Sequence, residues 1–190
     1  MASFDDKPIM HLTVTEWDAY LSADPSPDGV RLKLRKKSSR APGITWSEAL
    51  DVALCHGWID GQSKRFDDDY LLQAFTPRRR NSPWSQLNRE HVARLTEEGR
   101  MRAGGLAEVE RARADGRWDA AYRQRDAAPS PELQEALDRN PAAAEFIASL
   151  TKTERFRIYF RLGSIRTPAV RAARIADVVE KAARGEHHYR

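Results

Sequence analysis

The sequence is poor in groups that would cross-link the chain or anchor it in a membrane. It has one cysteine in 190 residues, so an intramolecular disulfide is excluded, and no paired Cys/His spacing indicates a structural zinc site. No apolar run approaches the roughly 20 residues that span a bilayer. Asp5 and Asp6 stand where a signal peptide needs a basic start. These absences predict a soluble cytoplasmic protein without a membrane span.

The sequence also lacks the common catalytic and cofactor-binding motifs. Glycine-rich phosphate loops, HExxH, GxSxG and Walker patterns are all missing. We therefore expect no cofactor, no catalytic residue and no functional metal, although His187 and His188 could bind a metal adventitiously. Whether the protein is an enzyme stays open, and a role without catalysis is favoured.

The overall charge is mildly basic. Lys and Arg number 32 against 28 Asp and Glu, a net charge of +4, and the pI is about 9.4. The charges are interspersed along the chain, as on ordinary solvated helix faces. Five tryptophans and 41% hydrophobic residues indicate a folded protein. An anionic partner is permitted by this composition and not required.

The first third of the chain predicts a short helix and a strand. Residues 1–11 resemble a loose leader, and Thr15 is expected to cap a helix whose apolar side carries Trp17. In residues 30–35 Val and Leu alternate with Arg and Lys, which is the period of a half-buried strand. The run 36–40 continues this basic charge into a loop.

Residues 45–89 are the most distinctive stretch of the sequence. Thr45 and Glu48 form a capping box that starts a helix, and Gly57 is placed to end it. Residues 58–65 and 70–76 then read as the two strands of an antiparallel hairpin, which Pro77 ends.

From Ser82 onward the pattern is helical. Ser82-Pro83 is expected to start a helix that Gly99 closes, and a linker is expected at 123–130. Further helix starts are predicted at four capping residues, namely Ser130, Asn140, Thr151 and Thr167. We therefore predict an α+β fold. Residues 12–122 form a small antiparallel sheet with flanking helices, and a helical C-terminal module, 130–185, packs on it.

Cys55, His56 and Asp60 invite comparison with a nucleophile, a base and an orienting acid. Adjacent residues on a helix point about 100° apart, so the first two cannot easily face each other. A lone cysteine is more often a small core residue. We favour a buried Cys55 and a capping or half-buried His56.

Two groups of polar residues are candidate ligand contacts. Asp60 and Lys64 are an even number of residues from Trp58 on the first hairpin strand, so the three side chains are expected on one face. This face is either a polar pocket or a solvated strand edge. Arg78 to Arg80 follow the second strand and precede the predicted helix start at Ser82, where arginine forks and free N–H groups suit a carboxylate or phosphate. Alternatively, these arginines only pair with the aspartates at 67–69.

Several segments resemble the bacterial YdeI/OmpD-associated family, also called the bacteriocin-protection or OmdA family. They are ALCHGWIDG with the following Lys64, then FTPRR, SxWS and Asn88, then GRM at 99–101, and SIRTPAVRAARIADVVEKAARG ending at Gly185. The resemblance implies a YjbR/CyaY-like α+β fold followed by helices. It implies protection against bacteriocins and cationic peptides, a form of stress resistance, and no established reaction. The candidate ligand-binding residues in these motifs are His56, Trp58, Asp60, Lys64, Arg78, Arg79, Ser82, Trp84 and Asn88.

Three functions remain open from the sequence. The favoured one is a non-catalytic binding or stress-protection protein that holds a small anionic ligand near the hairpin, or a protein partner. The alternative is an enzyme or small-metabolite binder that uses the face of Trp58, Asp60 and Lys64 with Arg78 and Arg79. Nucleic-acid binding, the least favoured, depends on the basic strand and the pI, and the run 31–40 has no interleaved aromatic residues.

Overall fold

The computed structural model describes residues 3–123 and 126–187. The chain divides into two compact units, Met1–Ala121 and Tyr122–Arg190, and each is described by itself. Gln124 and Arg125, which belong to the predicted linker, and His188 lie outside the described residues.

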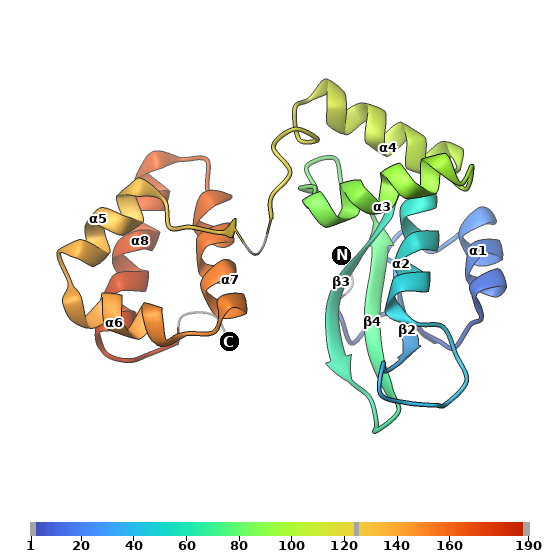
Figure 1. Cartoon of the computed structure of the whole chain (residues 1–190), viewed down its shortest axis with the longest axis horizontal. Helices are drawn as coiled ribbons and strands as arrows, with labels where there is room; N and C mark the ends of the chain where they lie inside the picture. The colour runs from blue at the N-terminus through green and yellow to red at the C-terminus, as the bar shows by residue number, and fades with distance from the viewer. Residues whose placement is uncertain (1–2, 124–125, 188–190) are drawn as a thin grey trace. The chain divides into compact units, whose positions relative to one another are not determined.

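The first unit has an α+β fold, as the sequence predicts (Figure 1). Its sheet has the strand order β1-β2-β4-β3. The elements are β1 (Ile9–Met10), α1 (Val14–Ser22), β2 (Val30–Arg35), α2 (Trp46–Cys55), β3 (Trp58–Arg65), β4 (Tyr70–Pro77), α3 (Gln86–Glu97) and α4 (Ala103–Ala114). Since β1 pairs with β2 in parallel, the sheet is mixed, and the expected purely antiparallel sheet is wrong. The predicted leader contributes this short strand.

The inner face of the sheet packs against α1 and α2. Val30, Leu32 and Leu34 are fully buried while Arg31, Lys33 and Arg35 are half-buried, which confirms the predicted alternation. Trp17 is the centre of this core: its ring lies 5.9 Å from that of Trp58 and 5.6 Å from that of Phe75. Its indole N–H donates to the carbonyl of Ala49 on α2. One tryptophan thus joins both helices to the sheet.

In the first unit, two of the predicted helix-capping residues are wrong and one is confirmed. Thr45 and Glu48 form the expected capping box of α2. In α1 the cap is Thr13, not Thr15, because Thr13 has Glu16 three residues later to complete the box.

In α3 the cap is Ser85, whose hydroxyl accepts from the backbone of Asn88. The Ser82 hydroxyl instead accepts from the backbone N–H of Arg79, so it stabilises the preceding turn.

A second core lies on the other side of α2. Leu50 and Leu54 pack with residues of α3, α4 and the flanking loops, which are Trp84, Val92, Leu95, Val109, Ala112 and Trp118. The first turn of α4 approaches the end of α2 so closely that a Cβ on Gly105 would lie 2.3 Å from the carbonyl oxygen of Cys55. Gly57 ends α2 as predicted, with a φ of 79° that favours glycine.

The second unit is a small helical bundle with its own core. It contains α5 (Pro131–Asp138), α6 (Pro141–Ser149), α7 (Lys152–Gly163) and α8 (Pro168–Ala183). The four predicted capping residues are the N-caps of these helices. Leu133, Ile147, Ile158, Leu162 and Val178 are among the buried residues. In the described ranges, no helix combines the length and apolarity needed to cross a membrane.

The packing of the helical unit on the first unit stays a prediction, and the tryptophans allow a direct test. All five lie in residues 17–118, so their fluorescence reports on the first unit, whereas the far-ultraviolet circular dichroism reports on both. If the units pack together, thermal unfolding followed by the two signals is expected to coincide. Two separate transitions, each kept by an isolated fragment, would contradict the prediction.

Candidate functional site

A cleft of about 220 Å³ lies beside α2. We call it the α2 cleft. Its lining comes from α1, α2 and the loop between α3 and α4, and consists of Val14, Thr15, Asp18, Val52, Cys55, Arg100 and Arg102. The loop residues reach this position because the backbone N–H of Arg102 donates to the carbonyl of Cys55 at 3.1 Å. The close approach of α4 to α2 therefore sets the position of one arginine.

Asp18 connects His56 to the cleft. The Nε2 atom of His56 lies 2.8 Å from one carboxylate oxygen of Asp18, and Arg102 lies 3.4 Å from the other. The hydrogen bond with His56, assisted by the charge of Arg102, holds the pKa of Asp18 below its ordinary value. Asp18 is therefore ionised at neutral pH, and it orients both the imidazole and the guanidinium.

Cys55 contributes a thiol with low reactivity. Its residue is 3% exposed, and burial raises the pKa of the thiol. The thiolate is the nucleophilic form of cysteine, so this environment disfavours attack on a substrate. The predicted burial of Cys55 is confirmed.

Arg100 is held at the cleft by a network around Asp51. The carboxylate of Asp51 lies 2.7 Å from Nη2 of Arg94 and 2.7 Å from Nδ1 of His91, and Arg100 lies 3.8 Å away. Burial acts to raise the pKa of Asp51, but the hydrogen bonds from Arg94 and His91 outweigh it and the pKa is lowered. Arg100 also contacts Glu98 at 3.0 Å. This network fixes α3 and its following loop against α2.

The structure does not bring Asp60 and Lys64 together as the sequence suggested. The pairing of β3 with β4 shifts register between Asp60 and Ser63, so Asp60 pairs with Phe75 and Lys64 with Leu72. Partners an odd number of residues apart on β4 point to opposite faces of the sheet. The expected shared face is therefore wrong, because a β-bulge reverses the parity between them.

Asp60 lies on the inner face and accepts a hydrogen bond from the indole of Trp46 at 3.1 Å. Burial raises the pKa of Asp60, and the bond from Trp46 and the charge of Arg78 offset this only in part. Trp58 is 5% exposed and belongs to the core. It does not line the α2 cleft.

The loop after β4 separates the two candidate arginines. Arg78 is buried, its guanidinium lies 3.6 Å from the ring centroid of Trp84, and it donates to the carbonyl of Pro83. Arg79 is exposed. Asn88 is buried in the first turn of α3. The aspartates at the hairpin tip contact other groups, namely Lys33, Arg65 and Ser39.

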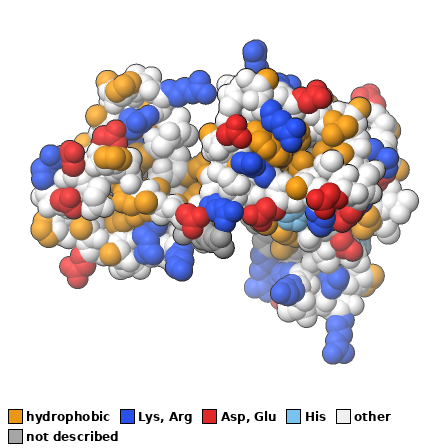
Figure 2. Space-filling view, turned by 45° about the horizontal axis from the view of Figure 1, so that its top comes forward, with side chains coloured by type: hydrophobic (Ala, Val, Ile, Leu, Met, Phe, Trp, Pro, Cys, Tyr) orange, Lys and Arg blue, Asp and Glu red, His pale blue; other side chains and the backbone are white. Residues whose placement is uncertain are grey.

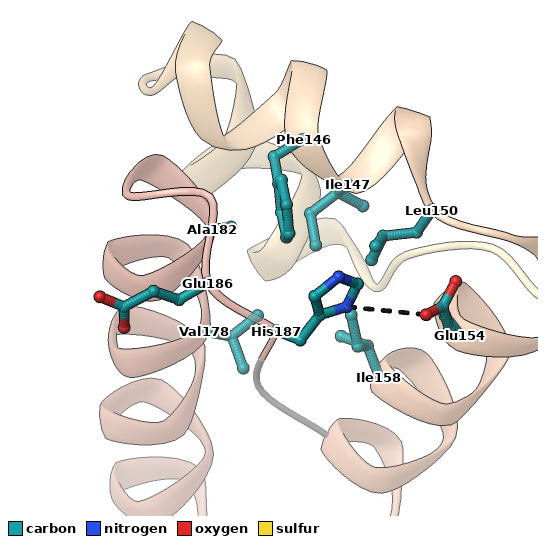
Figure 3. Close-up of a pocket in the computed structure, with 9 residues that line it drawn as sticks. All are labelled: Phe146, Ile147, Leu150, Glu154, Ile158, Val178, Ala182, Glu186 and His187. Atoms are coloured by element: carbon teal, nitrogen blue, oxygen red, sulfur yellow. Dashed lines mark ion pairs between the residues drawn. The ribbon is translucent and has the colours of Figure 1, made fainter. Parts of the chain in front are cut away.

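A second hollow, in the helical unit, is too small for a ligand. Figure 3 shows the ring of His187 between Phe146 and Glu154, while Glu186 points away. The space is about 10 Å³, which is the volume of a single water site. Nδ1 of His187 lies 3.6 Å from the Glu154 carboxylate. Among the residues that the structure describes, here included, no group of three His, Cys, Asp or Glu side chains could hold a metal ion.

Comparison with known proteins divides the chain in the same way. The family described as Domain of unknown function (DUF8412) matches residues 9–108, more than half of the chain. The chain belongs to this family. The family described as Bacteriocin-protection, YdeI or OmpD-Associated (OmdA) matches residues 127–185. No curated protein and no solved structure matches the chain significantly.

The DUF8412 region contains the whole α2 cleft. The resemblance to OmdA is therefore confirmed for the C-terminal helices, while the central motif belongs to the DUF8412 match. Sequence reasoning missed Asp18, Arg100 and Arg102 as a group. The GRM segment at 99–101 marked one of them, but the partner of Arg102 lies 84 residues away in sequence, and no local pattern reports that contact.

Proposed function

We propose that the protein is a non-catalytic binding protein that holds a small anion, such as phosphate or a short carboxylate, in the α2 cleft. The observation that carries the proposal is the position of Arg100 and Arg102 together at one hollow. Guanidinium groups match the geometry of phosphate and carboxylate oxygens and form charge-assisted hydrogen bonds with them.

The other lining residues support binding without a reaction. Val14 and Val52 are apolar, and the Cys55 thiol has a raised pKa. The nearby imidazole of His56 is held by Asp18. The volume of about 220 Å³ is below the range of drug-sized ligand pockets, which begins near 300 Å³. A compact anion therefore suits this cleft better than an extended metabolite.

The positive charge that would bind the anion is confined to the side chains that line the cleft. Acidic and basic side chains are interspersed on the surface seen in Figure 2, so a long-range field of one sign does not select the ligand. Specificity then depends on the two arginines and on Asp18, whose negative charge favours a ligand that also carries a hydrogen-bond donor.

The match of the C-terminal helices to the OmdA family supports a proposal for the cellular role of the protein. We infer a protective, stress-resistance function of the bacteriocin-protection type, exerted in the cytoplasm, with the anion or a protein partner as ligand. A YjbR/CyaY-like origin of the α+β unit is part of this proposal. An enzyme using Asp60 and Arg78 is the alternative, and the raised pKa of the Asp60 carboxyl is the observation in its favour.

The anion site is tested by two arginine substitutions. Arg102→Ala is expected to weaken phosphate or sulfate binding by about 1.5–3 kcal/mol, the size of a charge-assisted hydrogen bond, in calorimetry at low salt. Because the Arg102 side chain is partly exposed, the unfolding midpoint of the Arg102→Ala variant should stay near that of the wild type.

The matched control is Arg79→Ala, which removes an exposed arginine outside the cleft. It is expected to bind phosphate like the wild type. If Arg79→Ala abolishes binding and Arg102→Ala does not, the anion lies at the loop after β4, as the sequence alone suggested, and the assignment to the cleft is wrong.

A further inference from the structure

The outer face of the sheet is opposite to the face that α1 and α2 cover. Lys33 of β2 and Lys64 of β3 both pair with Leu72 of β4, so the three side chains form one row across this face. Arg31 lies two residues before Lys33 and has the same orientation. The three cations therefore come from two strands, β2 and β3, that β4 separates in the sheet.

Aromatic rings lie among these cations. The Lys33 ammonium is 4.1 Å from the ring centroid of Tyr70 and 4.8 Å from that of Phe66. Phe4 contributes a third ring, 5.2 Å from the Arg31 guanidinium and 4.8 Å from the Lys64 ammonium. The basic run 31–40 contains no aromatic residue, but folding brings rings from two distant segments to it. Alternating cations and rings are typical of surfaces that bind nucleotide units.

The N-terminal segment already occupies this face with a ring and an anion. The carboxylate of Asp5 lies 2.7 and 2.9 Å from the Lys64 ammonium and 3.5 Å from Nη1 of Arg31. The adjacent ring of Phe4 contacts the same two cations. Arg31 and Lys64 thus recognise a planar ring joined to a negative charge, with the chain itself supplying both.

We propose that Arg31 and Lys64 bind a planar ring that carries an anionic group, the chemistry of a nucleotide unit, and that Phe4 and Asp5 fill this site in the absence of ligand. The site is distinct from the α2 cleft, because α2 packs on the inner face. It adds a second ligand class to the proposed function.

The N-terminal segment that carries Phe4 and Asp5 is only loosely held on the outer face of the sheet. Asp5 is exposed, with 68% of its side-chain surface accessible, and Phe4 is only half-buried. Lys7, by contrast, is 5% exposed; its ammonium donates to the carbonyl of Asp28, and its own carbonyl accepts from Arg31 at 2.8 Å. Residues before Lys7 can therefore be displaced while the chain stays anchored.

Displacement changes the balance of charge on the face. With Asp5 in place, Arg31 and Lys64 share its carboxylate, and Lys33 lies 4.0 Å from Asp67. Once Asp5 leaves, Arg31 and Lys64 lose its carboxylate, while Lys33 keeps its contact with Asp67. A phosphate replaces the lost carboxylate, and a base replaces the ring of Phe4.

The first experiment removes the internal occupant in the full chain. Phe4→Ala/Asp5→Ala is expected to bind a fluorescent oligothymidylate of about 12 nucleotides about tenfold more tightly than the wild type, measured by anisotropy at low salt, because the competing contacts are gone. Adenosine monophosphate, measured by calorimetry, distinguishes the source of the ligand. A similar gain for both probes indicates a free nucleotide, and a gain for the strand alone indicates a single strand.

The second experiment uses two neighbouring cations in the double-variant background. Adding Lys64→Ala is expected to remove the gain, a loss of about tenfold. Adding Arg65→Ala is expected to leave the gain in affinity unchanged. Arg65 pairs with Leu71, so its side chain does not share the outer face with Lys64, and it contacts Asp68 instead. The proposal is overturned if neither probe binds the double variant more tightly than the wild type, or if the two added substitutions act alike.

Discussion

Trp84→Ala is expected to lower the free energy of unfolding of the α+β unit by about 3–5 kcal/mol, the usual cost of truncating a buried tryptophan. Trp84 is 2% exposed, and its ring lies 4.8 Å from that of Trp118. It also carries the buried guanidinium of Arg78 on its face. The alanine variant therefore leaves a cavity and removes the aromatic partner of a buried charge. Urea unfolding followed by the fluorescence of the remaining tryptophans measures the effect.

Two controls separate burial from other properties of tryptophan. Trp46 is 37% exposed and makes one indole hydrogen bond, to Asp60, so Trp46→Ala is expected to cost only about 0.5–1.5 kcal/mol. Trp84→Phe keeps a ring, and the indole N–H of Trp84 has no acceptor among the described residues. Phenylalanine should therefore recover most of the loss. Equal costs for Trp46→Ala and Trp84→Ala would contradict this account of the second core.

Gly105→Ala is the other substitution with a large expected effect. Alanine normally stabilises a helix relative to glycine by about 0.5–1 kcal/mol. Here the new Cβ would lie 2.3 Å from the carbonyl oxygen of Cys55 and 2.6 Å from that of Leu54, and both belong to rigid backbone. The helices must separate, so we expect a net loss of about 1–3 kcal/mol, the usual cost of overpacking.

The same substitution should also disturb the α2 cleft, because the backbone of Arg102 is bound to Cys55 at this contact. Phosphate affinity is expected to fall together with stability. Gly163→Ala is the matched control: its Cβ would meet no atom within 4 Å, and the helical unit should be stabilised by about 0.5–1 kcal/mol. A stabilising Gly105→Ala would show that the two helices are not packed as described.

The features that the sequence predicted correctly are local ones. The alternation of residues 30–35, the capping box of Thr45 and the turn at Gly57 each depend on side chains a few residues apart. The burial of Trp58 and Trp84 also follows from their place at element boundaries, and it is confirmed.

The errors have physical causes that short patterns cannot report. Ile9 and Met10 form a strand of two residues, too short to show a period. The bulge after Asp60 moves Lys64 to the other face, and Gly61 in the strand was its only local sign. The α2 cleft and the contacts of Asp5 with Arg31 and Lys64 join segments far apart in sequence. Such sites depend on tertiary packing, which periodicity does not encode.

The bulge in β3 also affects whether copies of the protein can associate through the edge of the sheet. In the strand order β1-β2-β4-β3, β3 is an edge of the sheet, and an edge strand with free backbone groups can add a strand from another molecule. An irregular register between Asp60 and Ser63 breaks the flat template, and Lys64 and Arg65 place charge at its outer half. Strand addition, and the aggregation to which it leads, is thereby disfavoured along this edge. Deletion of Gln62 would remove the extra residue of the bulge and restore a regular edge. A variant that still folds is then expected to be more prone to strand addition than the wild type.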